Sequence, residues 1–174
     1  MNLYLVGLRG SGKTTAGRIL AGRLGLAFVD ADAEVERRAG RTVAEIFARD
    51  GERRFRELER EAMQDLLARD GLVVATGGGC VLDAEVRAAL ARAGTAMWLD
   101  AAPGVRAARI AKSGRPPLTV HGGGTVEEEE VARTREPLYR DCAARRIVTD
   151  RRTPEEVADD VEQFWRSLPG HDVR

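Results

Sequence analysis

The hydrophobic positions of this chain alternate between two spacings from one end to the other. Short apolar runs without polar alternation occur at 3–6, 26–29, 72–75, 96–99 and 146–148, and such runs are typical of strands that are covered on both faces. Between them, apolar residues recur every three or four positions, as on the buried side of a helix. Five strands separated by helices predict a parallel sheet with helices on both faces, joined by right-handed connections.

Glycines and capping residues mark where the predicted helices begin and end. The first helix spans 13–24 and closes at Gly25. A capping box, Thr42 to Glu45, opens a second helix that ends at Gly51, and a third helix spans about 52–69. Further helices are expected to begin near three capping residues, namely Asp83, Thr125 and Thr153.

Composition and charge narrow the classes of protein that fit this pattern. The 174 residues fit one domain, 1–174, and the 28 basic and 28 acidic side chains cancel. No net positive charge is present to attract nucleic acid or an anionic membrane, and no apolar run approaches the roughly 20 residues of a membrane span. We therefore expect a cytoplasmic monomer without nucleic-acid or membrane partners. Its two cysteines, Cys80 and Cys142, are expected to be reduced packing thiols.

The segment from Gly7 to Thr14 matches the phosphate-loop pattern G-x-x-x-x-G-K-[ST] at every position, between a predicted strand and a predicted helix. Glycines let consecutive backbone N–H groups converge on phosphate oxygens, and the helix dipole adds positive potential. Lys13 is placed to reach the β- and γ-phosphates, and the Thr14 hydroxyl to bind Mg²⁺. Because only Lys13 and Lys112 are lysines, a chance match is disfavoured. The sequence predicts a nucleoside triphosphate site formed by Gly10, Ser11, Gly12, Lys13, Thr14 and Thr15.

Several classes of nucleotide-binding protein lack support in the chain. A GTPase needs an N-K-x-D motif, which neither lysine supplies. An oligomeric ATPase needs acids after an apolar strand, whereas 72–75 is followed by 76-TGGG-79. Asp30 and Asp32 instead follow the second strand, at the end where open α/β sheets bind ligands. Two interpretations remain open here. One carboxylate supports Mg²⁺ while the other faces the acceptor, or Asp32 caps a helix.

Six motifs together resemble those of the shikimate kinases. They occur in family order, at family-like spacing, and cover 7–154. They are the phosphate loop, D-x-D at 30–32, G-E-x-x-F-R at 51–56, G-G-G at 77–79, R-P-P-L at 115–118 and R-x-P-L-Y at 135–139. The phosphate loop alone is specific only to a superfamily, and the five later motifs make the resemblance specific.

The resemblance implies a fold and an activity. Shikimate kinases are three-layer α/β proteins of the nucleoside-monophosphate-kinase-like branch of P-loop folds, with a five-stranded parallel sheet in the order 2-3-1-4-5. They transfer the γ-phosphoryl of ATP to the 3-hydroxyl of shikimate, on the route to chorismate and the aromatic amino acids. The implied partners are therefore ATP and shikimate, and the implied cofactor is Mg²⁺.

The resemblance also implies roles for particular residues. Thr14 would bind Mg²⁺ directly, and Asp30 would bind it through water. Shikimate would be held by Asp32, Arg56, Gly77, Gly78, Gly79 and Arg135, with both arginines on its carboxylate. Arg109, Arg115 and Arg152 would bind ATP, the first and last on the adenine side. The implied catalytic residues are Lys13, Asp32 and Arg115. The acceptor region would span about 32–60 and a mobile lid about 113–125.

The chain departs from the family pattern in its lid. R-P-P-L stands where R-P-L-L is commoner, and 121-HGGG-124 has no counterpart. Further on, Pro137 is expected to kink or break its helix near Glu136 and so aim Arg135 inward. Three alternatives stay open, a gluconate kinase of the same fold, a nucleoside-monophosphate kinase and a catalytically silent module. Asp32, Arg56 and the triple glycine favour the cyclic acid.

Overall fold

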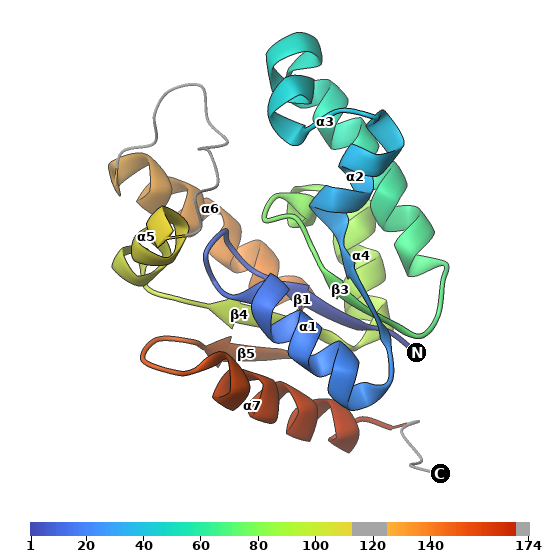
Figure 1. Cartoon of the computed structure of the whole chain (residues 1–174), viewed down its shortest axis with the longest axis vertical. Helices are drawn as coiled ribbons and strands as arrows, with labels where there is room; N and C mark the ends of the chain where they lie inside the picture. The colour runs from blue at the N-terminus through green and yellow to red at the C-terminus, as the bar shows by residue number, and fades with distance from the viewer. Residues whose placement is uncertain (113–124, 170–174) are drawn as a thin grey trace.

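The computed structural model describes residues 1–112 and 125–169, and it has a parallel sheet between two layers of helices (Figure 1). The strands are β1 (Leu3–Val6), β2 (Ala27–Asp30), β3 (Leu72–Ala75), β4 (Ala96–Asp100) and β5 (Arg145–Val148). They pair in parallel in the order β2-β3-β1-β4-β5. The predicted fold class and strand order are confirmed.

The helices begin and end close to the positions that the glycines and capping residues predict. They are α1 (Lys13–Leu24), α2 (Ala31–Ala39), α3 (Val43–Leu67), α4 (Ala84–Ala93), α5 (Pro103–Lys112), α6 (Thr125–Cys142) and α7 (Pro154–Ser167), with a 3₁₀ turn η1 at Cys80–Leu82. The capping boxes at Thr42 and Thr153 both form. The predicted lid, apart from Thr125, lies outside the described residues. Within those residues, no helix is long and apolar enough to cross a membrane.

Two separate cores hold the layers together, because alternate residues of a strand face opposite sides of the sheet. Leu3 and Leu5 of β1 pack with α1 and α7, whereas Tyr4 and Val6 pack with α3, α4 and α6. A third cluster, which includes Val35, Ile46, Phe55, Leu58 and Ala62, joins α2 to α3. In Figure 1, α2 and the N-terminal part of α3 lie beyond the end of the sheet at which β2 leads into α2.

Two breaks that the sequence predicts have different outcomes. Gly51 leaves helical geometry, with φ 77° and ψ 174°, and forms a kink within α3. The chain therefore does divide there into two helical halves. Pro137 lies within α6, which continues to Cys142, so the helix does not break near Glu136, and the alternative of a kink there stays a prediction. Tyr139 and Cys142 are buried beyond the proline, and their packing holds the last turns helical despite the lost backbone donor.

The two cysteines are free and buried, as predicted. Burial raises the pKa of Cys80 to about 12 and that of Cys142 to about 11. Both side chains are therefore neutral thiols near neutral pH, and they fill the core between the sheet and α6.

Candidate active site

The phosphate loop leaves the N-terminus of α1 open toward an anion. Gly7, Gly10 and Gly12 have φ values of 138°, 80° and 99°, a region that glycine reaches without strain. Gly12 is the N-cap of α1, and no side chain caps this helix. The first turn contains no acidic residue. The orphan N–H groups of the first turn are thus available to phosphate oxygens, supported by the helix dipole.

Lys13 folds back across this loop. Its Nζ donates to the carbonyl oxygens of Gly7 at 2.8 Å and of Leu8 at 2.9 Å, and the residue is 9% exposed. Burial lowers the pKa of Lys13 to about 8, although the charges of Asp32 and Asp30 act in the opposite direction. A phosphate beside Nζ would supply the missing negative charge and favour the ammonium form.

Thr14 and Asp30 bring two oxygen ligands together beside the loop. Thr14 Oγ1 donates to Asp30 Oδ2 at 2.9 Å. Asp30 Oδ1 accepts from the backbone N of Asp32 at 3.1 Å, so Asp30 is the N-cap of α2. The interpretation of Asp32 as the cap is wrong, because the strand ends at Asp30 and the helix begins at Ala31. Asp32 lies in the first turn and not on an extended end.

The residues beside the loop fit a magnesium ion that keeps most of its ligands as water and phosphate. No group of three or more His, Cys, Asp or Glu side chains in the described part of the chain is arranged to hold a metal by itself. A hydroxyl and a carboxylate are hard oxygen donors, and Mg²⁺ is usually bound by one or two such groups together with nucleotide phosphates.

Arg56 is held in place by two carboxylates of its own helix. Its Nη1 lies 2.6 Å from Glu59 Oε2 and its Nη2 lies 3.1 Å from Glu52 Oε1. Glu59 is 4% exposed, and its Oε1 has no hydrogen-bond partner among the described residues. Burial raises the pKa of Glu59, Arg56 and Arg135 lower it, and Asp32 raises it further. The carboxylate of Glu59 therefore lies near both arginines and near Asp32.

Sequence reasoning missed Glu59, although a signal is present. Positions 55, 58, 62 and 66 form the buried stripe of α3, and Glu59 falls within this stripe. A carboxylate at a core position three residues after an arginine is rarely placed there without a partner.

The triple glycine allows these side chains to converge. A Cβ on Gly77 would overlap Glu59 Oε1 and lie 2.7 Å from Asp32 Oδ1. A Cβ on Gly79 would overlap the guanidinium of Arg56. The same atom on Gly78 would lie 3.8 Å from Arg135 Nη1. The predicted substrate residues from α2, α3 and α6 thus meet around one loop at the end of β3.

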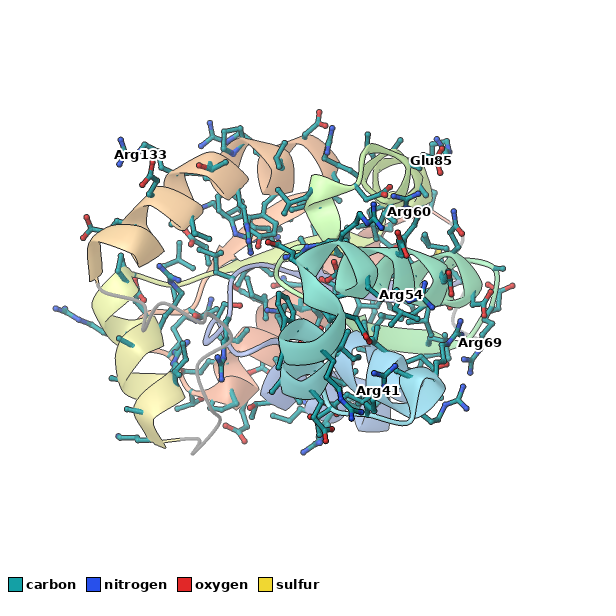
Figure 2. The ribbon with its side chains drawn as sticks, turned by 90° about the horizontal axis from the view of Figure 1, so that it is seen from above. Arg41, Arg54, Arg60, Arg69, Glu85 and Arg133 are labelled. Carbon is teal, nitrogen blue, oxygen red and sulfur yellow. The ribbon has the colours of Figure 1, made fainter. Side chains whose placement is uncertain are left out.

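Tyr139 ties α6 to this loop. Its hydroxyl donates to the carbonyl oxygen of Gly78 at 2.5 Å, and burial raises the pKa of the phenol above its usual range. The R-x-P-L-Y motif contains this tyrosine, but its hydrogen bond to Gly78 could not be predicted from the sequence. Arg135 lies one turn before Tyr139 and lowers its pKa. Figure 2 shows Arg133, on the same helix, pointing away from the molecule.

The two arginines expected near adenine lie in different surroundings. Arg109 donates to the carbonyl oxygen of Gly10 and to Thr149. Arg152 turns onto α7, where it pairs with Asp160 at 2.7 Å and donates to the carbonyl oxygen of Glu156 at 2.6 Å. Arg115 lies outside the described residues.

Comparisons with known proteins agree with this geometry. A family model for shikimate kinase matches residues 9–166. A shikimate kinase of Symbiobacterium thermophilum is 47% identical over 163 residues, which cover 92% of this chain and 94% of the relative. One of Synechococcus sp. is 43% identical over 96% of this chain and 83% of its own length. A solved shikimate kinase from Acinetobacter baumannii, in complex with shikimate, matches with a TM-score of 0.88 and 36% identity over 94% of this chain and 91% of that chain.

The sheet order and the phosphate loop beside a cluster of arginines and carboxylates define a small-molecule kinase of the P-loop class. The matches extend over nearly the whole chain and not over the loop alone. The chain belongs to the shikimate kinase family. This assignment removes the ground for the gluconate-kinase, nucleoside-monophosphate-kinase and silent-module interpretations.

Proposed function

We propose that this chain transfers the γ-phosphoryl group of ATP to the 3-hydroxyl of shikimate, within one domain of residues 1–174. The observation that carries the proposal is the convergence of Asp32, Arg56 and Arg135 on the triple glycine, next to an open phosphate loop. A small anion with several hydroxyls needs basic side chains for its carboxylate and short acceptors for its hydroxyls. The cluster supplies both.

The donor side of the reaction is assigned to the loop. Backbone amides at 10–15 receive the phosphates, and Lys13 exchanges its two carbonyl acceptors for phosphate oxygens. Thr14 and Asp30 would hold Mg²⁺, Asp30 through water, and the ion would neutralise negative charge on the phosphates. The chain's own contribution is alignment and electrostatic stabilisation, which dominate phosphoryl transfer.

The acceptor side is assigned to the region of about 32–60 together with Arg135. Arg56 is already oriented by Glu52 and Glu59, so less side-chain entropy is lost when its guanidinium meets a carboxylate. Asp32 faces the ring hydroxyls, orients the nucleophile and is the candidate to accept its proton. The backbone of Gly77, Gly78 and Gly79 lies close enough to this cluster to hold a further hydroxyl.

Gly79→Ala should raise the KM for shikimate by about tenfold or more, because the new methyl displaces Arg56 and weakens a charge-assisted hydrogen bond to the substrate. The KM for ATP should not change. Gly22→Ala is the control, since Gly22 is exposed on α1 and its Cβ would meet no atom within 4 Å. Steady-state kinetics on both substrates make the comparison, and an equal KM for shikimate in the two variants would remove Arg56 from the carboxylate site.

The lid at about 113–125 and its Arg115 remain predictions from the sequence. A cation there reaches the γ-phosphate only when the segment covers the site, and closure excludes water that competes for the phosphoryl group. Arg115→Ala should lower kcat by at least about tenfold and change shikimate affinity less, because the contact strengthens in the transition state. Full kcat in this variant, measured at saturating substrates, would contradict the role.

One assay tests the proposed activity as a whole. ATP consumption is coupled to a spectroscopic readout, with shikimate, gluconate and nucleoside monophosphates supplied in parallel. Turnover with shikimate alone is expected. Turnover with another acceptor and none with shikimate would contradict the proposal.

A further inference from the structure

The three glycines that follow β3 do not obtain the donors for their carbonyl groups from one source. The carbonyl oxygens of Gly77 and Gly79 accept N–H groups of η1 at 3.2 and 2.9 Å. The carbonyl oxygen of Gly78 accepts instead from the hydroxyl of Tyr139, which lies 61 residues later in the chain and 2.5 Å away. A carbonyl group that is shielded from water needs a donor, so the orientation of Gly78 depends on α6 and not only on its own loop.

Gly78 lies where the phosphate loop meets the cluster of arginines and carboxylates. A Cβ at this position would lie 3.5 Å from Gly7 O and 3.6 Å from Arg9 N, which both belong to the phosphate loop. The same Cβ would lie 3.8 Å from Arg135 Nη1. A small shift of Gly78 therefore changes its contact with the phosphate loop and with an arginine that we propose binds the substrate carboxylate.

Tyr139 is fixed by the core and not by the loop that it contacts. The residue is 1% exposed, and its ring stacks on Trp98 with the ring centroids 5.8 Å apart and an interplanar angle of 26°. Its carbonyl oxygen accepts from Ala143 N at 3.0 Å. Burial raises the pKa of the phenol, so the hydroxyl keeps its proton near neutral pH and acts as a donor.

The same hydroxyl accepts a hydrogen bond as well as donating one. Arg135 lies one turn before Tyr139 on α6, and its hydrogen bond and positive charge partly offset the effect of burial on the pKa of the phenol. The guanidinium of Arg135 is therefore a donor to the oxygen whose proton points to Gly78. One oxygen atom thus joins the triple glycine to Arg135, and both are predicted substrate residues.

We propose that the hydroxyl of Tyr139 is a positioning group for the acceptor, which sets Gly78 and Arg135 relative to each other before the substrate binds. The substrate then meets a guanidinium and a backbone that are already arranged, so less ordering is required on binding. Tyr139 acts through these two groups and is therefore a positioning residue. The inference rests on the proposed function, and it concerns the acceptor side of that site.

Tyr139→Phe keeps the ring and its packing and removes the hydroxyl alone. Gly78 then lacks this donor, and Arg135 lacks this acceptor. We expect the KM for shikimate to rise by about tenfold, which is a usual effect of leaving a buried hydrogen-bonding group without its partner. The KM for ATP should not change. The kcat at saturating shikimate should change much less than this KM, because the bound acceptor restores the arrangement.

Tyr4→Phe is the matched control, because the chain has two tyrosines and both are buried in the same core cluster. Tyr4 is 2% exposed, and its hydroxyl accepts from Asn2 Nδ2 at 2.9 Å. Each variant loses a buried hydroxyl, so both should unfold at a lower temperature than the parent protein. Only Tyr139→Phe should change the KM for shikimate, which separates positioning from a purely structural role.

A spectroscopic measurement makes the test independent of whether Tyr139→Phe folds. In the Tyr4→Phe variant Tyr139 is the only tyrosine, so fluorotyrosine supplied during expression gives a single fluorine resonance at this residue. Shikimate should shift this resonance, because its carboxylate draws the guanidinium of Arg135 away from the phenol oxygen. ATP should shift it less, since its phosphates are assigned to the phosphate loop.

An equal KM for shikimate in the two phenylalanine variants, or a fluorine resonance that shikimate leaves unchanged, would overturn the proposal. A KM for ATP that rises as much as the KM for shikimate would overturn it as well, and would assign Tyr139 to the phosphate loop. A parent protein that does not turn over shikimate would contradict the proposed function. The fluorine resonance, titrated with shikimate, would still test Tyr139 through binding alone.

Discussion

Lys13→Met is expected to reduce kcat by about three orders of magnitude, because a cation beside the transferring phosphoryl group is worth that much where such groups have been measured. The substitution keeps the length and apolar stem of the side chain, so the fold should persist. Lys112→Met is the matched control, since Lys112 is the other lysine of the chain and lies exposed at the end of α5. Steady-state kinetics of the two variants provide the comparison.

The same variant should also differ from the parent protein in how its stability depends on pH. The pKa of Lys13 is lowered to about 8 in the folded chain, against 10.5 for the ordinary amine, so the unfolded state binds the proton more readily. The parent protein should therefore gain stability as pH rises from about 8 toward 10.5. Lys13→Met lacks this dependence, so the parent protein should gain stability relative to the variant as pH rises above about 8. Retained turnover in the variant, or the same pH dependence of the unfolding temperature in both proteins, would contradict the assignment.

Asp32→Asn is expected to lower kcat by about two to three orders of magnitude, which is the usual worth of general acid–base assistance. Its effect on ATP affinity should be small, because Asp32 lies near Gly77 and Glu59, in the cluster that we propose binds the acceptor. Asp30→Asn is the contrasting variant. Asp30 accepts from Thr14 and caps α2, so its loss should weaken Mg²⁺-dependent ATP binding and the helix together.

Separate titrations with ATP and with shikimate distinguish these two carboxylates. Asp32→Asn should bind ATP as the parent protein does, with the loss confined to turnover. If ATP affinity fell in step with kcat, Asp32 would belong to the metal side, and the acceptor hydroxyl would need another orienting group.

The sequence predicts those features that depend on periodicity and on local motifs. The strands and the phosphate loop follow from apolar runs and from one glycine pattern with a strong local geometry, whereas the strand order follows from the resemblance to the shikimate kinases. The division of α3 at Gly51 follows for the same reason, because a φ of 77° is a local backbone conformation that glycine adopts without strain. Pro137 shows the limit of local reasoning. The tertiary packing of the buried Tyr139 outweighs the backbone hydrogen bond that the proline removes.

Features that depend on contacts between distant segments could not be predicted. Asp30 and Asp32 are two residues apart, and the position at which α2 begins decides which of them caps the helix. Arg109 stays a predicted adenine-side residue, and the structure adds contacts that the sequence does not indicate: its guanidinium donates to Gly10, 99 residues earlier in the chain, and to Thr149, 40 residues later. Neither partner carries a sequence signal for this contact.

The break at Gly51 also decides which part of the molecule carries Arg56, the arginine that we propose binds the substrate carboxylate. Arg56 and Glu59 belong to the half of α3 that follows Gly51, and Met63 and Leu66 of that half are buried against the sheet. Val43 and Ile46, before the glycine, belong to the cluster that Val35 of α2 forms with Phe55, Leu58 and Ala62 of the later half. The arginine proposed to bind the acceptor is thus attached to the same core as β1, the strand that leads into the phosphate loop. The helical segment Val43–Asp50 is therefore joined to this core through the cluster between α2 and α3 and not through the sheet.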